Sequence, residues 1–173
     1  METKEYNAFK TAIKRNNKLS APMKVLYDKG LLKGKILDYG CGFGEDVNKL
    51  KNLGYNIVGY DKYNTKFKID FLLDKMYSVV TCNYVFNVIQ KNEHDKLLKL
   101  LKSLGDEIYI SVRADKKAIK HNWVYDKDKD VYITTANTYQ RFYDEEMIYS
   151  YFSQVEYIVN NNNYKLFKIK GDV

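Results

Sequence analysis

Short apolar runs alternate with amphipathic stretches along most of the chain. The apolar runs predict strands at 35–39, 56–60, 78–83 and 107–112. Apolar residues at helical spacing predict helices at 3–17, 21–29, 46–53, 93–104 and 144–152. Strands that alternate with helices are typical of an α/β fold, in which helices cover both faces of a mainly parallel sheet.

The alternation is interrupted after the second strand and near the end of the chain. Residues 62–68 are too few for a full crossover, which needs a dozen or more residues, so we expect a shortened crossover. A short third strand is expected at 68–71. Two antiparallel hairpins are also expected, with strands at 123–125 and 131–134, and at 154–159 and 164–170 around an asparagine loop.

A glycine-rich turn follows the first predicted strand, with the spacing Asp38-x-Gly40-x-Gly42-x-Gly44. Glycines allow positive φ angles and let a ligand lie directly against the backbone. The free N–H groups of the helix that follows point towards the same place. The second strand also ends in a carboxylate, Asp61, 23 residues after Asp38. Nucleotide-binding folds use an acid there to hold ribose hydroxyls.

The spacing differs from the dinucleotide fingerprint, which would place a glycine where Glu45 stands. An acid beside a pyrophosphate would repel it, so the loop suits a ligand without phosphates. The glycine motif and Asp61 together resemble motifs I and II of the class I S-adenosylmethionine (SAM) methyltransferases. This resemblance implies a Rossmann-like α/β sandwich with sheet order 3-2-1-4-5-7-6 and an antiparallel strand 7.

The resemblance also implies SAM as the cofactor and a set of residues that bind it: Asp38, Gly40, Gly42, Gly44, Asp61, Asp70, Asn83 and Tyr84. The glycines would pass under the methionine part of SAM, and Asp38 would meet its amino group. Asp61 would accept the ribose hydroxyls, and Asp70 would lie near the adenine. Asn83 and Tyr84 would border the sulfonium and the methyl acceptor.

Polar side chains that follow the later strands are candidates for acceptor binding: Asn87, Arg113, Gln140 and Arg141. Clustered near the cofactor, they would suit a polar or anionic acceptor. We assign no catalytic acid or base, because a sulfonium methyl is already activated and transfer needs mainly positioning. Asn83 is not followed by the proline pair of amino-group methyltransferases acting on nucleobases, so a standard adenine-N6 enzyme is not expected.

A narrower resemblance joins four segments to a group of methyltransferases found with DNA phosphorothioation genes: 31–42, 83–89, 111–113 and 138–143. The match covers about residues 18–152. It implies a nucleic acid or a nucleotide-like molecule as the acceptor.

Charge is concentrated at the start of the chain. Residues 1–35 hold nine Lys or Arg and three acids, a net charge of +6, whereas the whole chain carries +7. A basic N-terminal arm beside a cofactor domain indicates contact with a nucleic acid or another polyanion. The alternative is a solvated helix in a lysine-rich protein.

Length and composition indicate one domain, 1–173, with basic N-terminal helices at 1–33. No apolar run reaches the roughly 20 residues that span a bilayer, and we expect neither a signal peptide nor a membrane contact. Two cysteines, without a disulfide framework or metal-ligand spacing, suggest a cytoplasmic protein without a metal.

Three functions fit the sequence. The first is a SAM-dependent methyltransferase acting on a nucleic acid or a nucleotide-like acceptor. The second is a small-molecule methyltransferase whose N-terminal helices form a lid. The third is a non-catalytic SAM-binding module that serves as a partner subunit.

Overall fold

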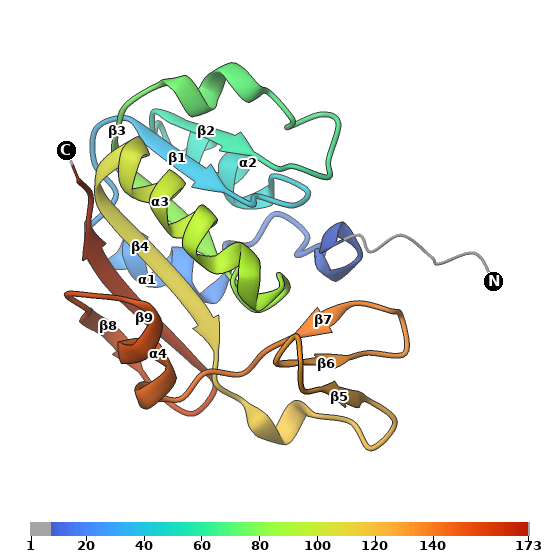
Figure 1. The fold of residues 1–173 in the computed structure, drawn as a ribbon. Coiled ribbons are helices and arrows are strands. Elements are labelled where there is room, and N and C mark those ends of the chain that lie inside the picture. Colours follow the sequence, from blue (N-terminus) through green and yellow to red (C-terminus); the bar gives the residue numbers. More distant parts are fainter. Residues whose placement is uncertain (1–7, 173) are drawn as a thin grey trace.

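The structure, a computed structural model that describes residues 8–172, is built on a six-stranded sheet of order β2-β1-β3-β4-β9-β8 (Figure 1). The strands are β1 (Ile36–Tyr39), β2 (Ile57–Tyr60), β3 (Tyr77–Asn83), β4 (Gly105–Arg113), β8 (Glu156–Asn160) and β9 (Tyr164–Lys170). The first four are parallel, and β9 runs antiparallel to both β4 and β8. These strands follow the expected order without its third strand, and the antiparallel strand is confirmed.

The sheet has one strand fewer than the seven of the expected order. The prediction of a short third strand at 68–71 is wrong, because a 3₁₀ helix, Asp70–Asp74, begins in this region. Only residues 61–76 connect β2 to β3, and this connection has to pass β1 on the way. The Tyr77 hydroxyl donates to the Leu72 carbonyl at 2.9 Å and draws the connection back to β3.

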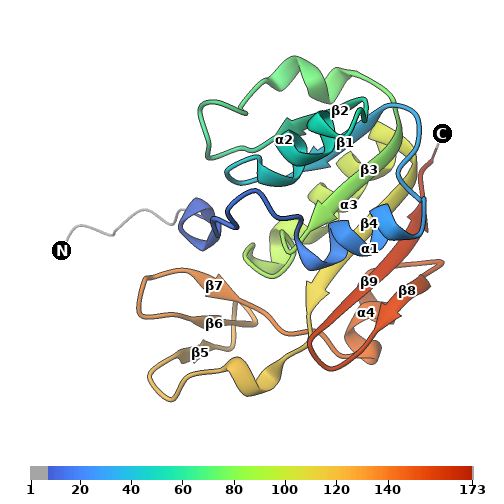
Figure 2. The same cartoon turned by 180° about the vertical axis from the view of Figure 1, so that it is seen from behind.

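Helices cover both faces of the sheet. On one face, α3 (His94–Leu104) and α4 (Glu145–Tyr151) pack against one apolar cluster, and both are seen in front in Figure 1. On the other face, α1 (Ala21–Asp28) and α2 (Glu45–Asn52) pack against a second cluster, as Figure 2 shows from behind. The result is the three-layer sandwich that the sequence predicts.

The N-terminal segment is less helical than predicted. Part of the predicted helix 3–17 lies outside the described residues, and the described part forms only a 3₁₀ helix, Ala8–Thr11. Asn16 and Asn17 take positive φ angles of 52° and 62°, which a helix does not allow. Helix α1 begins where the sequence indicates, because the Ser20 side chain accepts a hydrogen bond from the Met23 N–H.

A second, smaller sheet extends beyond β4. The predicted hairpin is present as β5 (Val124–Asp126) and β6 (Val131–Ile133), and β7 (Tyr139–Gln140) adds a third antiparallel strand. In Figure 1 this sheet stands apart from the main sheet, on the side of the N-terminal segment.

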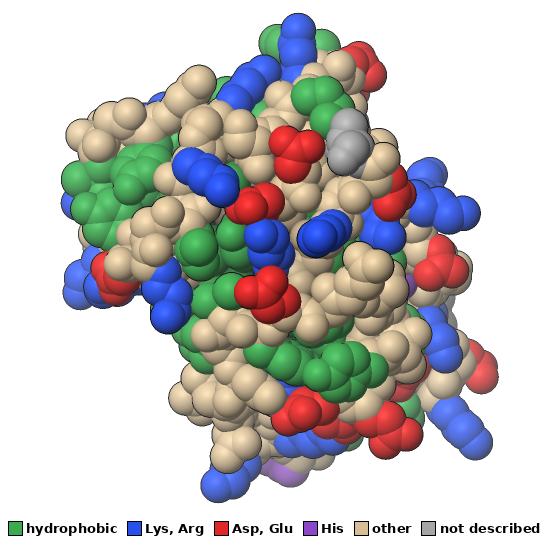
Figure 3. Space-filling view, turned by 90° about the vertical axis from the view of Figure 1, so that its left-hand side faces the viewer, with side chains coloured by type: hydrophobic (Ala, Val, Ile, Leu, Met, Phe, Trp, Pro, Cys, Tyr) green, Lys and Arg blue, Asp and Glu red, His purple; other side chains and the backbone are tan. Residues whose placement is uncertain are grey.

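On the face shown in Figure 3, lysine and arginine side chains are mixed with aspartate and glutamate. Within residues 8–172, none of the helices combines the length and the apolar character required to cross a membrane.

Candidate functional site

A cavity of about 880 Å³ lies at the carboxyl ends of the parallel strands, within the range of small-molecule sites. Strand register brings the predicted residues to this edge, since Asp38 pairs with Thr81 and Asn83 pairs with Ser111. Its wall includes the N-terminal segment, the glycine turn, the loops after β2 and β3, part of the helix that begins at His94, and the residues around Arg113, Gln140 and Tyr164.

Two features of the turn require glycine at positions 40 and 42: a positive φ angle and a lack of room for a Cβ atom. Gly40 has a φ of 75°, and a Cβ there would collide with the Val85 side chain. Gly42 has a φ of 56°, and a Cβ there would lie 3.1 Å from the methyl group of Ala12. Both residues line the cavity. Gly44, in contrast, precedes α2 as its N-terminal cap and is not among the cavity-lining residues, so its predicted cofactor contact is not supported.

Asp61 is buried at the cavity wall and holds the turn in place. One of its oxygens, Oδ2, accepts the Gly42 N–H at 2.8 Å, and Oδ1 accepts the N–H groups of Tyr63 and Asn64 at 2.9 and 3.1 Å. The Asn64 side chain donates to the Gly42 carbonyl at 2.8 Å. A carboxylate has about four acceptor positions, so one position on Oδ2 is open to a ligand.

Asp38 is buried beneath the turn and accepts a hydrogen bond of 2.8 Å from the Thr81 hydroxyl. Burial, followed by the nearby Asp46 carboxylate, raises the pKa of Asp38 to about 8. A cation in the cavity would favour its ionised form.

Asn83 is the last residue of β3, Tyr84 follows it, and both line the same cavity. The Ser111 hydroxyl donates to Asn83 Oδ1 at 2.9 Å, which orients the amide and leaves Nδ2 as a buried donor without a partner in the described structure. Tyr84 has a φ of 61°, an unfavourable angle for a residue with a large side chain. Such backbone strain is often found at functional sites. The Ser111 carbonyl accepts the Tyr84 N–H at 2.9 Å and so holds the backbone in this conformation.

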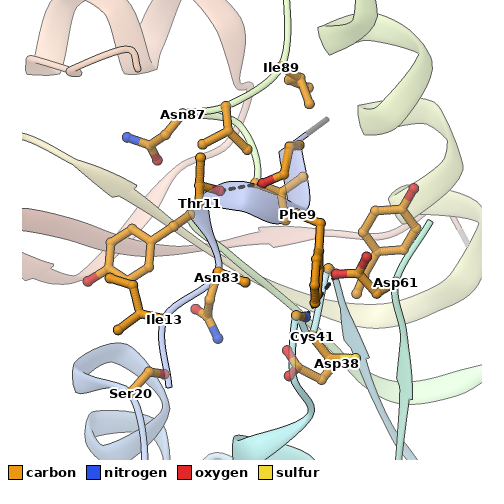
Figure 4. Close-up of a pocket in the computed structure, with 18 of the residues that line it drawn as sticks. Phe9, Thr11, Ile13, Ser20, Asp38, Cys41, Asp61, Asn83, Asn87 and Ile89 are labelled. Atoms are coloured by element: carbon orange, nitrogen blue, oxygen red, sulfur yellow. Dashed lines mark hydrogen bonds between the residues drawn. The ribbon is translucent and has the colours of Figure 1, made fainter. Parts of the chain in front are cut away.

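The N-terminal segment crosses the glycine turn and closes one side of the cavity. The Phe9 ring meets Phe43 edge to face at 4.8 Å, and Figure 4 shows Phe9 pointing towards Cys41 and Asp61. Further along, the segment is anchored to the start of α2. The Arg15 guanidinium lies 3.0 Å from Asp46 Oδ2, and the Arg15 backbone N–H donates to the Glu45 carboxylate.

Three of the four predicted acceptor residues line the cavity: Asn87, Arg113 and Gln140. The Arg113 guanidinium donates to Gln140 Oε1 at 3.2 Å, while Asn87 Oδ1 accepts the Arg113 backbone N–H at 3.2 Å. Asn87 also donates to the Arg141 carbonyl at 2.7 Å, so its amide is held on both sides.

Arg141, the fourth, does not line the cavity. It is 2% exposed, and its guanidinium donates at 2.8 Å to the carbonyls of both Lys129 and Asp130. A third contact, 2.6 Å long, joins it to His94 Nε2. Burial, followed by the Arg141 charge, lowers the pKa of His94 to about 4. The predicted acceptor contact of Arg141 is therefore wrong, because its side chain holds the small sheet against the start of α3.

Asp70 is also away from the cavity. It is exposed on the 3₁₀ helix and accepts a hydrogen bond of 3.3 Å from the Tyr60 hydroxyl. Its predicted place beside an adenine depended on a third strand, which the short connection does not form. Tyr39, Tyr60 and Leu73 line the cavity instead.

Several cavity residues were not predicted, including Phe9, Thr11 and Tyr164. For Tyr164 a signal existed, because a final strand antiparallel to β4 has to begin at the carboxyl edge, and Tyr164 pairs with Arg113. Phe9 had no comparable signal. In residues 8–172 there is no group of three or more His, Cys, Asp or Glu suited to a metal ion.

A family model for the methyltransferase domain matches residues 11–161, which are most of the chain and include all four parallel strands β1 to β4. The chain belongs to the methyltransferase domain family. No curated protein matches the sequence of this methyltransferase domain.

Solved structures share the fold of the methyltransferase domain at low sequence identity. A SAM-dependent methyltransferase from Bacteroides fragilis in complex with S-adenosyl-L-homocysteine (SAH) is 12% identical, with a TM-score of 0.60 over 90% of this chain and 79% of the other. A protein from Pyrococcus horikoshii is 12% identical, with a TM-score of 0.63 over 87% and 89%. The magnesium protoporphyrin IX methyltransferase from Synechocystis with bound SAH is 16% identical, with a TM-score of 0.52 over 87% and 80%.

Proposed function

We propose that the protein is a SAM-dependent methyltransferase, with SAM bound along the glycine turn and a small acceptor beside Asn83 and Tyr84. The observation that carries this proposal is the single cavity that the glycine turn, Asp61 and the loop after β3 share. Structural neighbours whose names include SAM or SAH support the choice of cofactor.

In this proposal each cavity residue positions one part of SAM. The open position on Asp61 Oδ2 accepts a ribose hydroxyl, and Asp38 becomes ionised next to the ammonium group. The unpartnered Asn83 Nδ2 donates to the cofactor or the acceptor, which would satisfy a buried group that otherwise costs free energy. Methyl transfer is an in-line displacement, so holding the two reactants together supplies most of the rate.

The N-terminal segment favours a small acceptor over a duplex, because it packs against the glycine turn and forms part of the cavity wall. A nucleic acid or nucleotide-like acceptor is the second candidate, and one observation favours it. Lys10, Lys14 and Lys18 are exposed on the segment that forms the cavity wall. The resemblance to methyltransferases of phosphorothioation systems points to the same class of acceptor.

Calorimetry with SAH tests the cofactor assignment. The wild type is expected to bind SAH, and Asp61→Asn is expected to bind it at least tenfold more weakly, since a charged hydrogen bond contributes about 1.5–3 kcal/mol. Asp106→Asn is the matched control and should bind like the wild type, because Asp106 is exposed and does not line the cavity. Normal SAH binding by Asp61→Asn would refute the ribose contact.

Transfer of a labelled methyl group from SAM into fractionated DNA, RNA, protein and metabolites tests the reaction. Label in the metabolite fraction is expected for a small acceptor, and label in DNA or RNA would favour the second candidate. SAH binding without any transfer would instead support a non-catalytic SAM-binding subunit.

A further inference from the structure

Arg113 stands at the acceptor end of the cavity, where β4 ends. It pairs with Tyr164 across the sheet and lies two residues after Ser111, the partner of Asn83. Its side chain is half-buried and lines the cavity together with Gln140. A permanent positive charge therefore faces the place where a methyl acceptor has to sit.

Arg113 differs from the other two arginines in its lack of an acidic partner. Arg15 pairs with Asp46 and Arg141 with Asp130, whereas no carboxylate oxygen in residues 8–172 lies within 4.0 Å of the Arg113 guanidinium. Asp115 lines the same end of the cavity without pairing with it. The Arg113 guanidinium is thus partly buried without a carboxylate to balance its positive charge.

Neighbouring groups fix the guanidinium while leaving most of its donors free. The Phe142 ring lies 4.9 Å from its central carbon, and Gln140 Oε1 accepts one N–H at 3.2 Å. A guanidinium has five N–H donors, so the others remain available in a planar fork that matches a carboxylate or a phosphate. Such preorganisation reduces the entropy lost when an anion binds.

Two aromatic rings adjoin this charge. Tyr84 and Tyr164 meet edge to face at 6.4 Å, and both line the cavity. They offer an apolar surface to the part of a ligand next to its anionic group.

We propose, resting on the function above, that Arg113 and Gln140 form the acceptor subsite and that the acceptor is a small organic anion with a carboxylate or phosphate group. The body of the acceptor lies against Tyr84 and Tyr164, which brings its methyl-accepting atom towards Asn83. Arg113 determines specificity by selecting negative charge.

Binding of model ligands to the SAH-saturated protein tests this assignment. Benzoate and phenyl phosphate are the anionic probes, one for each source of charge, and benzamide is the neutral probe of similar shape. Calorimetry at constant ionic strength is expected to show at least one anion binding tenfold or more tightly than benzamide. Arg113→Gln is expected to remove this preference, and Arg113→Lys to retain part of it, while both variants bind SAH within about twofold of the wild type.

Lys120→Gln is the control, because it removes an exposed charge that does not line the cavity. Equal binding of anions and benzamide by the wild type, or unchanged anion binding by Arg113→Gln, would overturn the subsite. A large loss of SAH affinity in Arg113→Gln would overturn it too, by assigning the guanidinium to the carboxylate of the cofactor. If the wild type does not bind SAH, the proposed cofactor fails, and the same probes on the free protein still decide whether Arg113 selects anions.

Discussion

At the scale of single residues, the buried carboxyl of Asp38 couples the cavity to pH. Its raised pKa means that it is mainly protonated in the ligand-free fold at neutral pH, whereas in the unfolded chain it is ionised. Between about pH 4 and pH 8 the unfolded state therefore binds fewer protons at this site. The contribution of Asp38 to stability falls as the pH rises through this window.

Asp38→Asn removes this dependence, since an amide does not titrate. The free energy of unfolding of the variant is expected to rise relative to the wild type, by up to about 1.4 kcal/mol for each pH unit between pH 5 and pH 8. Urea unfolding at several pH values without ligand measures the difference. Asp74→Asn is the control, because Asp74 is exposed; a constant difference for Asp38→Asn would contradict the assignment.

Arg141 shows a purely structural use of charge. Arg141→Met is expected to lower the free energy of unfolding by about 3 kcal/mol, because the carbonyls of Lys129 and Asp130 lose their donor in a buried place. Chemical denaturation measures this loss. Lys127→Met, an exposed change in the same hairpin, should stay within about 0.5 kcal/mol of the wild type.

The sequence predicted correctly those cavity residues whose place depends only on where a strand ends. Asp38, Asp61 and Asn83 end neighbouring parallel strands, so their convergence follows from the strand order. Gln140 and Arg141 could not be separated in this way, because neighbouring side chains along an extended segment point to opposite sides. The sequence does not say which side faces the cavity, and in the structure it is that of Gln140.

At the scale of elements, the six strands of the main sheet were predictable and the conformation of the N-terminal segment was not. Apolar residues in this segment fit a helical period. The described part, residues 8–20, is instead mostly irregular and packs across the glycine turn; we call it the N-terminal strap. Its position depends on side-chain contacts between Arg15, Ser20 and the start of α2, which lie far apart in the sequence. Likewise, the loss of the third strand depended on how tightly 61–76 turns back to the sheet.

Loosening this strap should speed ligand exchange. Arg15→Gln removes the ion pair with Asp46, and we expect SAH to dissociate about fivefold faster, a change of about 1 kcal/mol for a partly buried pair. Stopped-flow displacement measures the rate. Lys18→Gln removes an exposed charge from the same segment and should leave the rate unchanged; equal rates for both variants would show that the strap does not retain the ligand.

At the scale of the whole molecule, the basic N-terminal region gives a testable preference for polyanions. Arg15 is neutralised by Asp46, so the positive charges of this segment that have no acidic partner in the described structure are those of Lys10, Lys14 and Lys18. Changing all three to Gln is expected to weaken binding of a single-stranded oligonucleotide. The slope of log affinity against log salt concentration should become shallower by about 2.

Fluorescence anisotropy at several salt concentrations measures both quantities. A control variant with Lys51, Lys99 and Lys120 changed to Gln has the same net charge and alters exposed sites elsewhere. If the two triple variants behave alike, total charge rather than the N-terminal segment governs the contact.

The two ends of the main sheet bear on how the protein behaves at high concentration. Outermost strands present unpaired backbone groups, which can recruit strands from other molecules. Here β2 has only four residues, and the register between β8 and β9 shifts at Tyr157/Val159. Short and irregular edges are poor templates for intermolecular pairing. Without a third strand, the sheet ends at β2, whose four residues offer few unpaired backbone groups to another molecule.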